Sequence, residues 1–196
     1  MAPLQRTFNI VTAAAGLLVL SPLFAIVALA IKCTDGGPVF YSQARVGQGF
    51  RTFHLLKFRS MVVHAEKTGS LTIANDARVT RCGRFLRKYK LDELPQLWNV
   101  LMGEMQLVGA RPEVGPYVEM FRHQYAPLLS EPPGITDPAS LAYRHESQVL
   151  LTGDIEQQYI SRILPAKLRL SLEYQKSRTL VSDIRVILTT VFQLAS

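Results

Sequence analysis

Cysteine and histidine are scarce in this sequence, and the motifs of several common enzyme classes are missing. The 196 residues include two cysteines and four histidines. Cys33 and Cys82 form no Cys-x-x-Cys pair, which argues against a disulfide framework or a structural zinc site and fits a reducing compartment. The histidines lack metal-ligand spacing. The chain has no Walker loop, dinucleotide-binding glycine fingerprint or serine-hydrolase pattern, which argues against those classes.

The sequence also lacks internal repeats, low-complexity tracts and linkers rich in proline, glycine or serine. Its length is sufficient for one domain with a core. The net charge of +7 and the pI near 9.6 favour an anionic partner, which can be nucleic acid, a phosphorylated substrate or an anionic membrane. The 48% hydrophobic content and mean hydropathy of +0.13 are high beside 19% charged residues, and the excess lies mainly between Ile10 and Ile31.

The apolar run from Ile10 to Ile31 carries no charged side chain and has the length of a bilayer-spanning helix. A signal peptide would be cleaved near Ala28-Leu29-Ala30, but the run is long for one and only Arg6 precedes it. A spanning helix is the second alternative. Basic residues flank both ends of the run, so the positive-inside rule orients it only weakly.

The Ser21-Pro22 pair at the middle of the run opens a third alternative, a re-entrant helix that enters and leaves on one face. Proline removes a backbone donor and kinks a helix, and the Ser21 hydroxyl is a nearby group that can help to satisfy the backbone. From the residues alone, a kinked spanning helix explains the pattern equally well.

The rest of the chain predicts an α+β fold that is mainly helical. Pro38–Gln43 and Thr52–Phe58 flank a glycine-bearing turn and predict a β-hairpin, and the polar residues 64–76 predict a loop. The last predicted helix carries an apolar i, i+3, i+4 stripe that fits packing on a core or lying in a membrane interface equally well. The predicted helices are Val79–Tyr89, Leu94–Leu101, Glu113–Leu129, Asp154–Arg178 and Ser182–Leu194.

Asp92 and Glu93 stand side by side in a segment rich in arginine and lysine. Because Pro95 is tolerated only in the first turn of a helix, we expect a helix to begin at about Asp92. Ordinary capping would explain a carboxylate there. Arg78, Arg84 and Arg87 recur at helical intervals and could share one face that holds a diphosphate, although a solvated stripe or an anionic-lipid contact would give the same pattern. The basic residues upstream of the carboxylates are Arg78, Arg81, Arg84, Arg87, Lys88 and Lys90.

Adjacent carboxylates suit phosphoryl chemistry. A carboxylate can attack phosphorus and form an acyl phosphate, and attack on a diphosphate requires its negative charge to be neutralised. Mg²⁺ suits hard oxygen ligands together with phosphate, and it usually takes one or two protein carboxylates. Asp92 and Glu93 would point in different directions from one helical turn, so one can attack while the other helps to hold the metal. The residues alone do not assign the two roles.

Four motifs behind the apolar N-terminal segment resemble the bacterial sugar transferase family of membrane-embedded polyprenyl-phosphate phosphoglycosyl transferases. They are Lys57-Phe58-Arg59-Ser60-Met61, residues 77–87 (ARVTRCGRFLR), residues 91–101 (LDELPQLWNVL) and Gly109-Ala110-Arg111-Pro112. The resemblance is specific from about Arg6 to Pro112 and looser beyond it. It corresponds to the family's minimal, single-domain catalytic unit.

The resemblance implies a re-entrant membrane helix over residues 1–32, broken at Ser21-Pro22. It implies a catalytic domain over residues 33–196, with amphipathic interfacial helices, on the cytoplasmic face of the bacterial inner membrane. The implied reaction moves a phosphosugar from a UDP-sugar to polyprenyl (undecaprenyl) phosphate and releases UMP, which starts the synthesis of exopolysaccharide, lipopolysaccharide or another glycoconjugate. The implied cofactor is Mg²⁺, and the expected state is a monomer or homodimer that contacts membrane lipid and no nucleic acid.

By the same resemblance Asp92 is the nucleophile, Glu93 is its partner carboxylate and both hold Mg²⁺. A polar cluster after a loop rich in proline and glycine could contact sugar or nucleotide, or form a local ion pair. The residues implied at substrate phosphates are Lys57, Arg59 and Arg111, joined by Arg78 and Arg87 of the basic face. The residues expected near the nucleotide or sugar are Gly134 and Thr136 of a Pro-Gly-Ile-Thr segment, and Tyr143 and Arg144 of the polar cluster that continues to His145 and Glu146.

Two positions depart from the family pattern. Ala110 replaces a proline, which loosens the backbone before Arg111 and puts the fine positioning of that residue in doubt. In the hairpin turn, Gly49 stands one place before the usual glycine, which Phe50 replaces, and we expect little functional effect.

Two other functions compete with the transferase. A non-enzymatic basic membrane adaptor that binds anionic lipid or nucleic acid would tolerate Asp92→Asn. A polytopic transferase without a covalent intermediate requires several spanning helices, whereas the sequence offers one long apolar segment, so this alternative is disfavoured.

Overall fold

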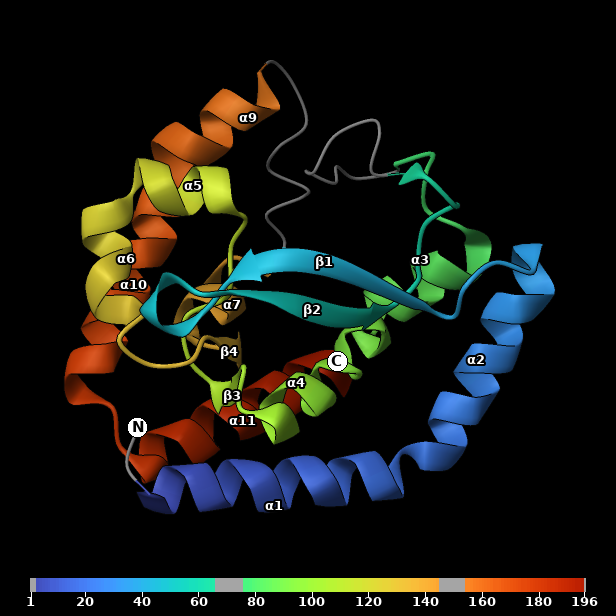
Figure 1. Ribbon diagram of the computed structural model, residues 1–196, viewed down its shortest axis with the longest axis horizontal. Coiled ribbons are helices and arrows are strands. Elements are labelled where there is room, and N and C mark those ends of the chain that lie inside the picture. Colours follow the sequence, from blue (N-terminus) through green and yellow to red (C-terminus); the bar gives the residue numbers. More distant parts are fainter. Residues whose placement is uncertain (1–2, 66–75, 145–153, 196) are drawn as a thin grey trace.

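The structure, a computed structural model, describes residues 3–65, 76–144 and 154–195. It confirms a mainly helical fold with a small antiparallel hairpin, which crosses the middle of the molecule in Figure 1. The elements are α1 (Pro3–Val19), α2 (Ser21–Asp35), β1 (Phe40–Val46), η1 (Gln48–Phe50), β2 (Thr52–Phe58), α3 (Arg81–Lys88), η3 (Leu91–Glu93), α4 (Gln96–Met102), β3 (Gln106–Val108), α5 (Gly115–Met120), α6 (Arg122–Leu128), β4 (Gly134–Thr136), α7 (Pro138–Ala142), α9 (Ile155–Gln158), η4 (Tyr159–Ile163), α10 (Leu164–Ser177) and α11 (Leu180–Ala195).

The predicted break at Ser21-Pro22 is confirmed, because α1 and α2 meet there at a bend of 59°. Pro22 has no N–H to donate to the carbonyl of Leu18, four residues earlier, and the Ser21 hydroxyl donates to that carbonyl instead at 2.8 Å. Within the described ranges no single helix is long and apolar enough to cross a bilayer, whereas α1 and α2 together meet that test as a bent pair. The bent pair is consistent with a re-entrant helix.

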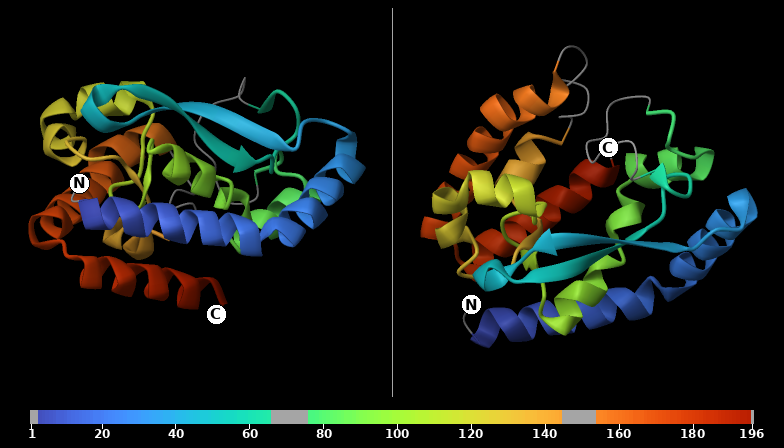
Figure 2. Two further views of the ribbon diagram at one scale, coloured as in Figure 1. Left: turned by 60° about the horizontal axis from the view of Figure 1, so that its bottom comes forward. Right: turned by 45° about the horizontal axis from the view of Figure 1, so that its top comes forward.

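One face of α1 is attached to the rest of the protein, and Figure 2 shows α1 lying along α4 before the chain bends into α2. The Arg6 guanidinium donates to the carbonyls of Val100 (2.7 Å) and Leu101 (2.9 Å) at the end of α4. The buried Asn9 accepts a hydrogen bond from the backbone N–H of Leu107 in β3 at 3.2 Å. Arg6 thus satisfies the Leu101 carbonyl at the end of α4 and is a second donor to that of Val100, which also accepts from the N–H of Gly103, while Asn9 satisfies an N–H of β3. The opposite face of α1 exposes large apolar side chains, namely Leu4, Ile10, Val11, Leu18 and Val19.

The hairpin prediction is confirmed, with β1 paired antiparallel to β2 from Phe40↔Phe58 to Val46↔Thr52. The first strand begins two residues later and ends three residues later than expected. In the turn, Gly49 and Phe50 both have φ of 62°. The left-handed region disfavours a residue with a Cβ by about 1–2 kcal/mol, and the packing of the Phe50 ring under the Arg122 guanidinium, 4.4 Å from its centroid, offsets part of that cost.

A second, two-stranded sheet was not expected from the sequence. Strands β3 and β4 pair in parallel, with Gln106 opposite Gly134 and Val108 opposite Thr136. A Cβ on Gly134 would lie 2.1 Å from the backbone N of Gly109, so only glycine fits at this crossing. Each strand has three residues, too few for an alternation of apolar and polar side chains to reveal it.

Several predicted helices differ from those in the structure. The helix expected over Glu113–Leu129 is divided into α5 and α6, which meet at Phe121. The helix expected over Asp154–Arg178 contains the π-helical turn η4 and ends at Ser177. The α-helix expected from about Asp92 is wrong in type, because residues 91–93 form a 3₁₀ turn and α4 begins at Gln96. Most of the loop predicted at 64–76 lies outside the described residues.

Helix α11 has one buried and one exposed apolar face. Asp183 and Val186 are buried, and the helix packs against β3 and β4. The exposed face presents the apolar side chains of Val181, Ile184, Leu188, Val191 and Phe192. The helix therefore packs on the core, and its place at a membrane interface stays a prediction.

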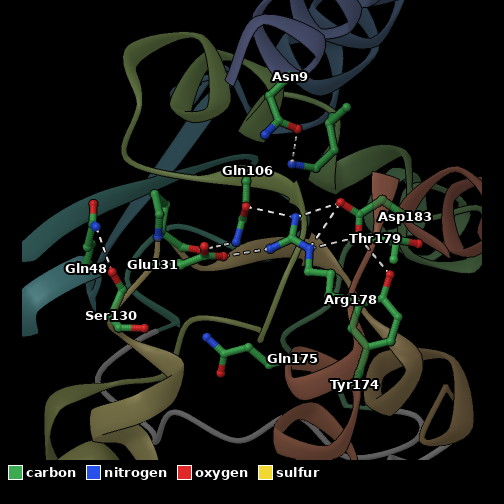
Figure 3. Close-up of polar contacts among 12 residues, drawn as sticks. Asn9, Gln48, Gln106, Ser130, Glu131, Tyr174, Gln175, Arg178, Thr179 and Asp183 are labelled. Carbon is green, nitrogen blue, oxygen red and sulfur yellow. Dashed lines mark hydrogen bonds and ion pairs between the residues drawn. The ribbon is translucent and has the colours of Figure 1, made fainter. Parts of the chain in front are cut away.

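A buried cation joins the end of α10 to the second sheet (Figure 3). The Arg178 guanidinium contacts both carboxylate oxygens of Asp183 (2.8–3.1 Å), Glu131 Oε2 (2.9 Å) and Gln106 Oε1 (3.0 Å). The Gln106 amide in turn donates to the carbonyl of Pro132 at 2.6 Å. Charge-assisted hydrogen bonds of this kind hold their partners in fixed geometry, so α11, β3 and the segment before β4 are held together.

The close approach at Gly134 gives a test of this packing. Gly134→Ala is expected to lower the melting temperature of the purified protein by about 5 °C or more, because overpacking against backbone costs about 1–3 kcal/mol or more. Gly115→Ala is the matched control, since a Cβ there meets nothing within 4 Å. Equal melting temperatures for the two variants would contradict the tight β3–β4 crossing.

Candidate active site

The two adjacent carboxylates lie on a continuous helical stretch that runs from η3 into α4. The turn is stabilised by 3₁₀-type bonds, such as Leu94 N–H to the Leu91 carbonyl at 3.2 Å. Lys90, immediately before it, has φ of 54° and turns the chain from α3 into η3. The turn packs against β2 and α3, so its side chains meet residues from both elements.

Glu93 is held between two cations from distant parts of the chain. Its Oε1 accepts from Lys57 Nζ of β2 at 3.0 Å, and both of its oxygens pair with the Arg111 guanidinium from the loop after β3. Only 12% of the Glu93 side chain is exposed. Burial raises the pKa of Glu93, but the positive charges of Arg111, Lys57 and Lys90 outweigh it and hold the pKa well below its usual value. Glu93 is therefore ionised at neutral pH.

Asp92 has the opposite environment. It is 6% exposed, and its Oδ1 has no hydrogen-bond partner within the described ranges. Burial and the neighbouring charge of Glu93 raise the pKa of Asp92, against the pull of Lys57, Lys90 and Arg87. Two neighbouring carboxylates whose pKa values are displaced in opposite directions are typical of a catalytic pair with separate roles.

Two arginines of the predicted basic face lie near this pair. Arg87 donates from Nε to the Ser60 hydroxyl at 2.8 Å, and burial lowers its pKa against the attraction of Asp92 and Asp76. Arg78 forms a bidentate pair with Asp76 at 2.6–3.0 Å. The structure therefore brings Arg87, Lys57 and Arg111 around the acidic pair and holds Arg78 close by, against Asp76. Their contact with substrate phosphates stays a prediction.

Arg59 has a different environment. Its guanidinium pairs with both oxygens of Asp35 at the end of α2, and its Nε donates to the carbonyl of Pro38 at 2.6 Å. These contacts tie the bent N-terminal pair to the hairpin. A phosphate contact by Arg59 stays a prediction. In this structure the Arg59 side chain links the end of β2 to the end of α2.

The residues expected near the nucleotide or sugar are spread over β4 and the end of α7. Gly134 and Thr136 belong to β4, where the Thr136 hydroxyl shares a hydrogen bond of 2.9 Å with Thr190 of α11. Tyr143 follows α7 and packs against the hydrophobic core cluster that contains Tyr117. The backbone N–H of Arg144 donates to the carbonyl of Leu141. His145 and Glu146 lie outside the described residues. A role at nucleotide or sugar stays a prediction for all four expected residues.

The donor set at η3 fits Mg²⁺ in its usual protein environment. Within the part of the chain that the structure describes, no group of three or more His, Cys, Asp or Glu side chains could hold a metal ion. Mg²⁺ usually takes one or two carboxylates and completes its octahedron with waters and substrate phosphates. Asp92, with a buried oxygen that has no hydrogen-bond partner among the described residues, and Glu93 supply that number of carboxylates, and a metal ion at Glu93 would share it with Lys57 and Arg111.

Two polar residues on the same face of the stretch were not expected from the sequence. Gln96 and Asn99 are 1% and 2% exposed, and they follow Asp92 by four and seven residues. This spacing places all three on one face of a helix. The spacing was the available signal, but polar residues at core positions are indistinguishable from surface residues until burial is known.

Comparison with known proteins gives one consistent result. The family model described as bacterial sugar transferase matches residues 1–196. The exopolysaccharide production protein ExoY of Rhizobium meliloti is 34% identical over 172 residues, which cover 80% of this chain and 76% of ExoY.

Two further relatives are longer proteins. The UDP-glucose:undecaprenyl-phosphate glucose-1-phosphate transferase of Escherichia coli is 35% identical over 195 residues, which are 97% of this chain and 40% of that protein. The UDP-N-acetylgalactosamine-undecaprenyl-phosphate N-acetylgalactosaminephosphotransferase of Aeromonas hydrophila is 43% identical over 119 residues, 60% of this chain and 28% of that protein. The chain thus spans less than half the length of these two relatives.

The contacts of Glu93 predict a large effect on stability. Glu93→Gln leaves Lys57 and Arg111 largely buried without their negative partner, which is expected to cost about 3 kcal/mol of unfolding free energy. Glu119→Gln is the control, since its pair with Arg122 is exposed and contributes at most about 1 kcal/mol. Denaturant unfolding of both variants measures the difference. Similar losses in the two would show that the Glu93 contacts are not a buried ion pair.

The raised pKa of Asp92 predicts a pH-dependent gain from its removal. The folded state binds this proton more readily than the unfolded chain, so ionised Asp92 lowers stability as pH rises above its ordinary pKa of 3.8. Asp92→Asn is therefore expected to melt at a higher temperature than the wild type at pH 7 and to lose that advantage near pH 4. A lower melting temperature at pH 7 would mean that the ionised carboxylate is stabilised in the fold.

Proposed function

Because this chain belongs to the bacterial sugar transferase family, we propose that it is a membrane phosphoglycosyl transferase. In this proposal it transfers a sugar 1-phosphate from a UDP-sugar to polyprenyl phosphate, releasing UMP. The family match and the named activities of the relatives support the reaction class, and glucose and N-acetylgalactosamine are the sugars that their names contain. Initiation of a surface polysaccharide such as an exopolysaccharide follows from that class and from the likeness to ExoY.

The observation that carries the proposal is the contrast between Asp92 and Glu93. Glu93 is neutralised by Lys57 and Arg111, so it is a poor nucleophile but a fixed negative charge that holds both cations at the site. Asp92 Oδ1 is buried and has no hydrogen-bond partner in the described chain, so it keeps its lone pairs for reaction. A nucleophile next to a charged, cation-lined site is the arrangement that attack on a diphosphate requires.

The proposed reaction has two in-line displacements at the same phosphorus. First, an Asp92 oxygen forms a bond to the β-phosphorus of the UDP-sugar, and the bond from that phosphorus to the bridging oxygen breaks. The electron pair leaves with the bridging oxygen on UMP, and the phosphosugar remains on Asp92. Second, a phosphate oxygen of the polyprenyl phosphate attacks the same phosphorus and breaks the bond to Asp92. The carboxylate is regenerated and the product is a polyprenyl diphosphosugar.

The cations and Mg²⁺ have complementary tasks in this proposal. Lys57, Arg87 and Arg111 neutralise the phosphates and orient them towards Asp92. Asp92 and Glu93 would hold Mg²⁺, which when bound supplies further positive charge at the diphosphate. In this proposal α1 lies in the membrane and is hydrogen-bonded to α4, which follows Asp92 in the chain. The acceptor headgroup and the nucleophile would therefore lie near one membrane face. We place residues 1–32 in the bilayer as a re-entrant helix and residues 33–196 on the cytoplasmic face of the inner membrane.

The test is nucleotide release by detergent-solubilised protein with Mg²⁺, undecaprenyl phosphate and a panel of UDP-sugars. UMP release with one sugar identifies the donor, and Asp92→Asn is expected to reduce it by about 1000-fold or more, because a nucleophile is removed. Asp154→Asn is the matched control, since Asp154 is exposed and caps the short helix α9. Its rate is expected to equal that of the wild type.

Two results would reject the proposal. UMP release that survives in Asp92→Asn would exclude the covalent route. The absence of release with every UDP-sugar, from folded and membrane-bound protein, would leave the adaptor that binds anionic lipid or nucleic acid as the better explanation.

A further inference from the structure

Gln96 is a buried polar residue whose side-chain amide is not satisfied by the protein. The residue is 1% exposed, and its Nε2 has no hydrogen-bond partner in residues 3–65, 76–144 and 154–195. Leaving a buried donor unpaired is costly, and native proteins rarely do so without a structural or functional reason. Gln96 is the first residue of α4, four residues after Asp92, whose Oδ1 is the other unpartnered buried atom of this stretch.

Asn99, on the same face of α4, has a side-chain amide with hydrogen bonds at both its nitrogen and its oxygen. Its Nδ2 donates to the carbonyl of His54 at 2.8 Å and to Glu104 at 2.7 Å, and its Oδ1 accepts from the N–H of Leu56 at 3.0 Å. These contacts bind α4 to β2. Asn99 is therefore a structural amide, whereas Gln96, three residues earlier, makes no such contact through its Nε2.

The kind of partner that Gln96 requires follows from its chemistry. An amide N–H₂ only donates, so a metal ion at the carboxylates cannot satisfy it. The partner has to be an acceptor, and the i, i+4 spacing of Asp92 and Gln96 makes the two side chains neighbours on one face of the helical stretch. The group that comes to Asp92 in the proposed reaction is a phosphoryl group, whose non-bridging oxygens are strong acceptors.

We infer that Gln96 is a further catalytic residue, whose side-chain amide donates to a non-bridging oxygen of the phosphoryl group transferred through Asp92. This inference rests on the proposed function. The donor is buried, so a hydrogen bond from it to these oxygens meets little competition from water and stabilises the charge that spreads over them as phosphorus changes partners. On this inference Nε2 has no partner among the described residues because its acceptor arrives with the substrate.

The inference is tested by comparing Gln96→Met with Asn99→Leu, which both replace an amide with an apolar side chain of similar size. Gln96→Met removes an unsatisfied group, so its melting temperature is expected to equal or exceed that of the wild type, while kcat for UMP release falls about 100-fold. Asn99→Leu is expected to melt about 5 °C lower or more, because three hydrogen bonds are lost. A melting temperature of Gln96→Met that falls like that of Asn99→Leu would overturn the inference.

A second measurement separates this inference from the proposed function. Inorganic pyrophosphate, which carries the phosphoryl oxygens without nucleotide or sugar, is expected to raise the melting temperature of the wild type more than that of Gln96→Met, because the variant keeps Lys57, Arg87 and Arg111 but lacks the amide donor. Failure of the wild type to release UMP would reject the proposed function, and the pyrophosphate response would then decide the role of Gln96. An equal response in both proteins, or none in the wild type, would overturn the contact between Gln96 and phosphate.

Discussion

The arrangement of the site depends on the pairing of Glu93 with Lys57 and Arg111. The three residues come from η3, from β2 and from the loop after β3, so one carboxylate joins three segments that are far apart in the chain. Breaking a buried ion pair lowers the stability of the fold, because each remaining charge would lie in the protein interior without a partner or water. The pairing also distinguishes the two carboxylates: both oxygens of Glu93 pair with cations, whereas Asp92 Oδ1 is buried and has no hydrogen-bond partner among the described residues.

Hydrogen bonds around this pairing hold the backbone next to Arg111 in place, so that its guanidinium can reach Glu93. The backbone before Arg111 has alanine at position 110, where the family resemblance leads us to expect proline, and in the structure hydrogen bonds hold it. Gly134 N–H donates to the Ala110 carbonyl and Gly109 N–H to the Thr136 carbonyl, both at 2.9 Å. Arg178 also stabilises the β3–β4 pair, because its guanidinium donates to the side chain of Gln106 in β3 (Figure 3). Tertiary hydrogen bonds thus supply the rigidity that a proline would have supplied locally.

The site carries features that a fold selected for stability alone would avoid. Asp92 and Gln96 each bury a polar atom that has no partner among the described residues, whereas the amide of Asn99 on the same face is hydrogen-bonded at both its nitrogen and its oxygen. Such groups lower stability and are characteristic of sites that keep their partners for a substrate. Arg6 and Asn9 attach α1 to α4 and β3, so the bent N-terminal pair is hydrogen-bonded to the helix that follows the turn Leu91–Glu93.

The sequence by itself determined the local features of this protein. Pro22 set the break between α1 and α2, and β-branched and aromatic segments around a glycine-bearing turn set the hairpin, because each depends on neighbouring residues only. The Asp-Glu pair before Pro95 indicated a candidate site only together with the basic residues and family motifs around it. Tertiary structure decided the rest. The β3–β4 pair, the binding of Glu93 by Lys57 and Arg111, the pairing of Arg59 with Asp35 and the burial of Gln96 join residues distant in sequence. Periodicity and spacing along the chain carry no information on such contacts, which arise only when the elements pack.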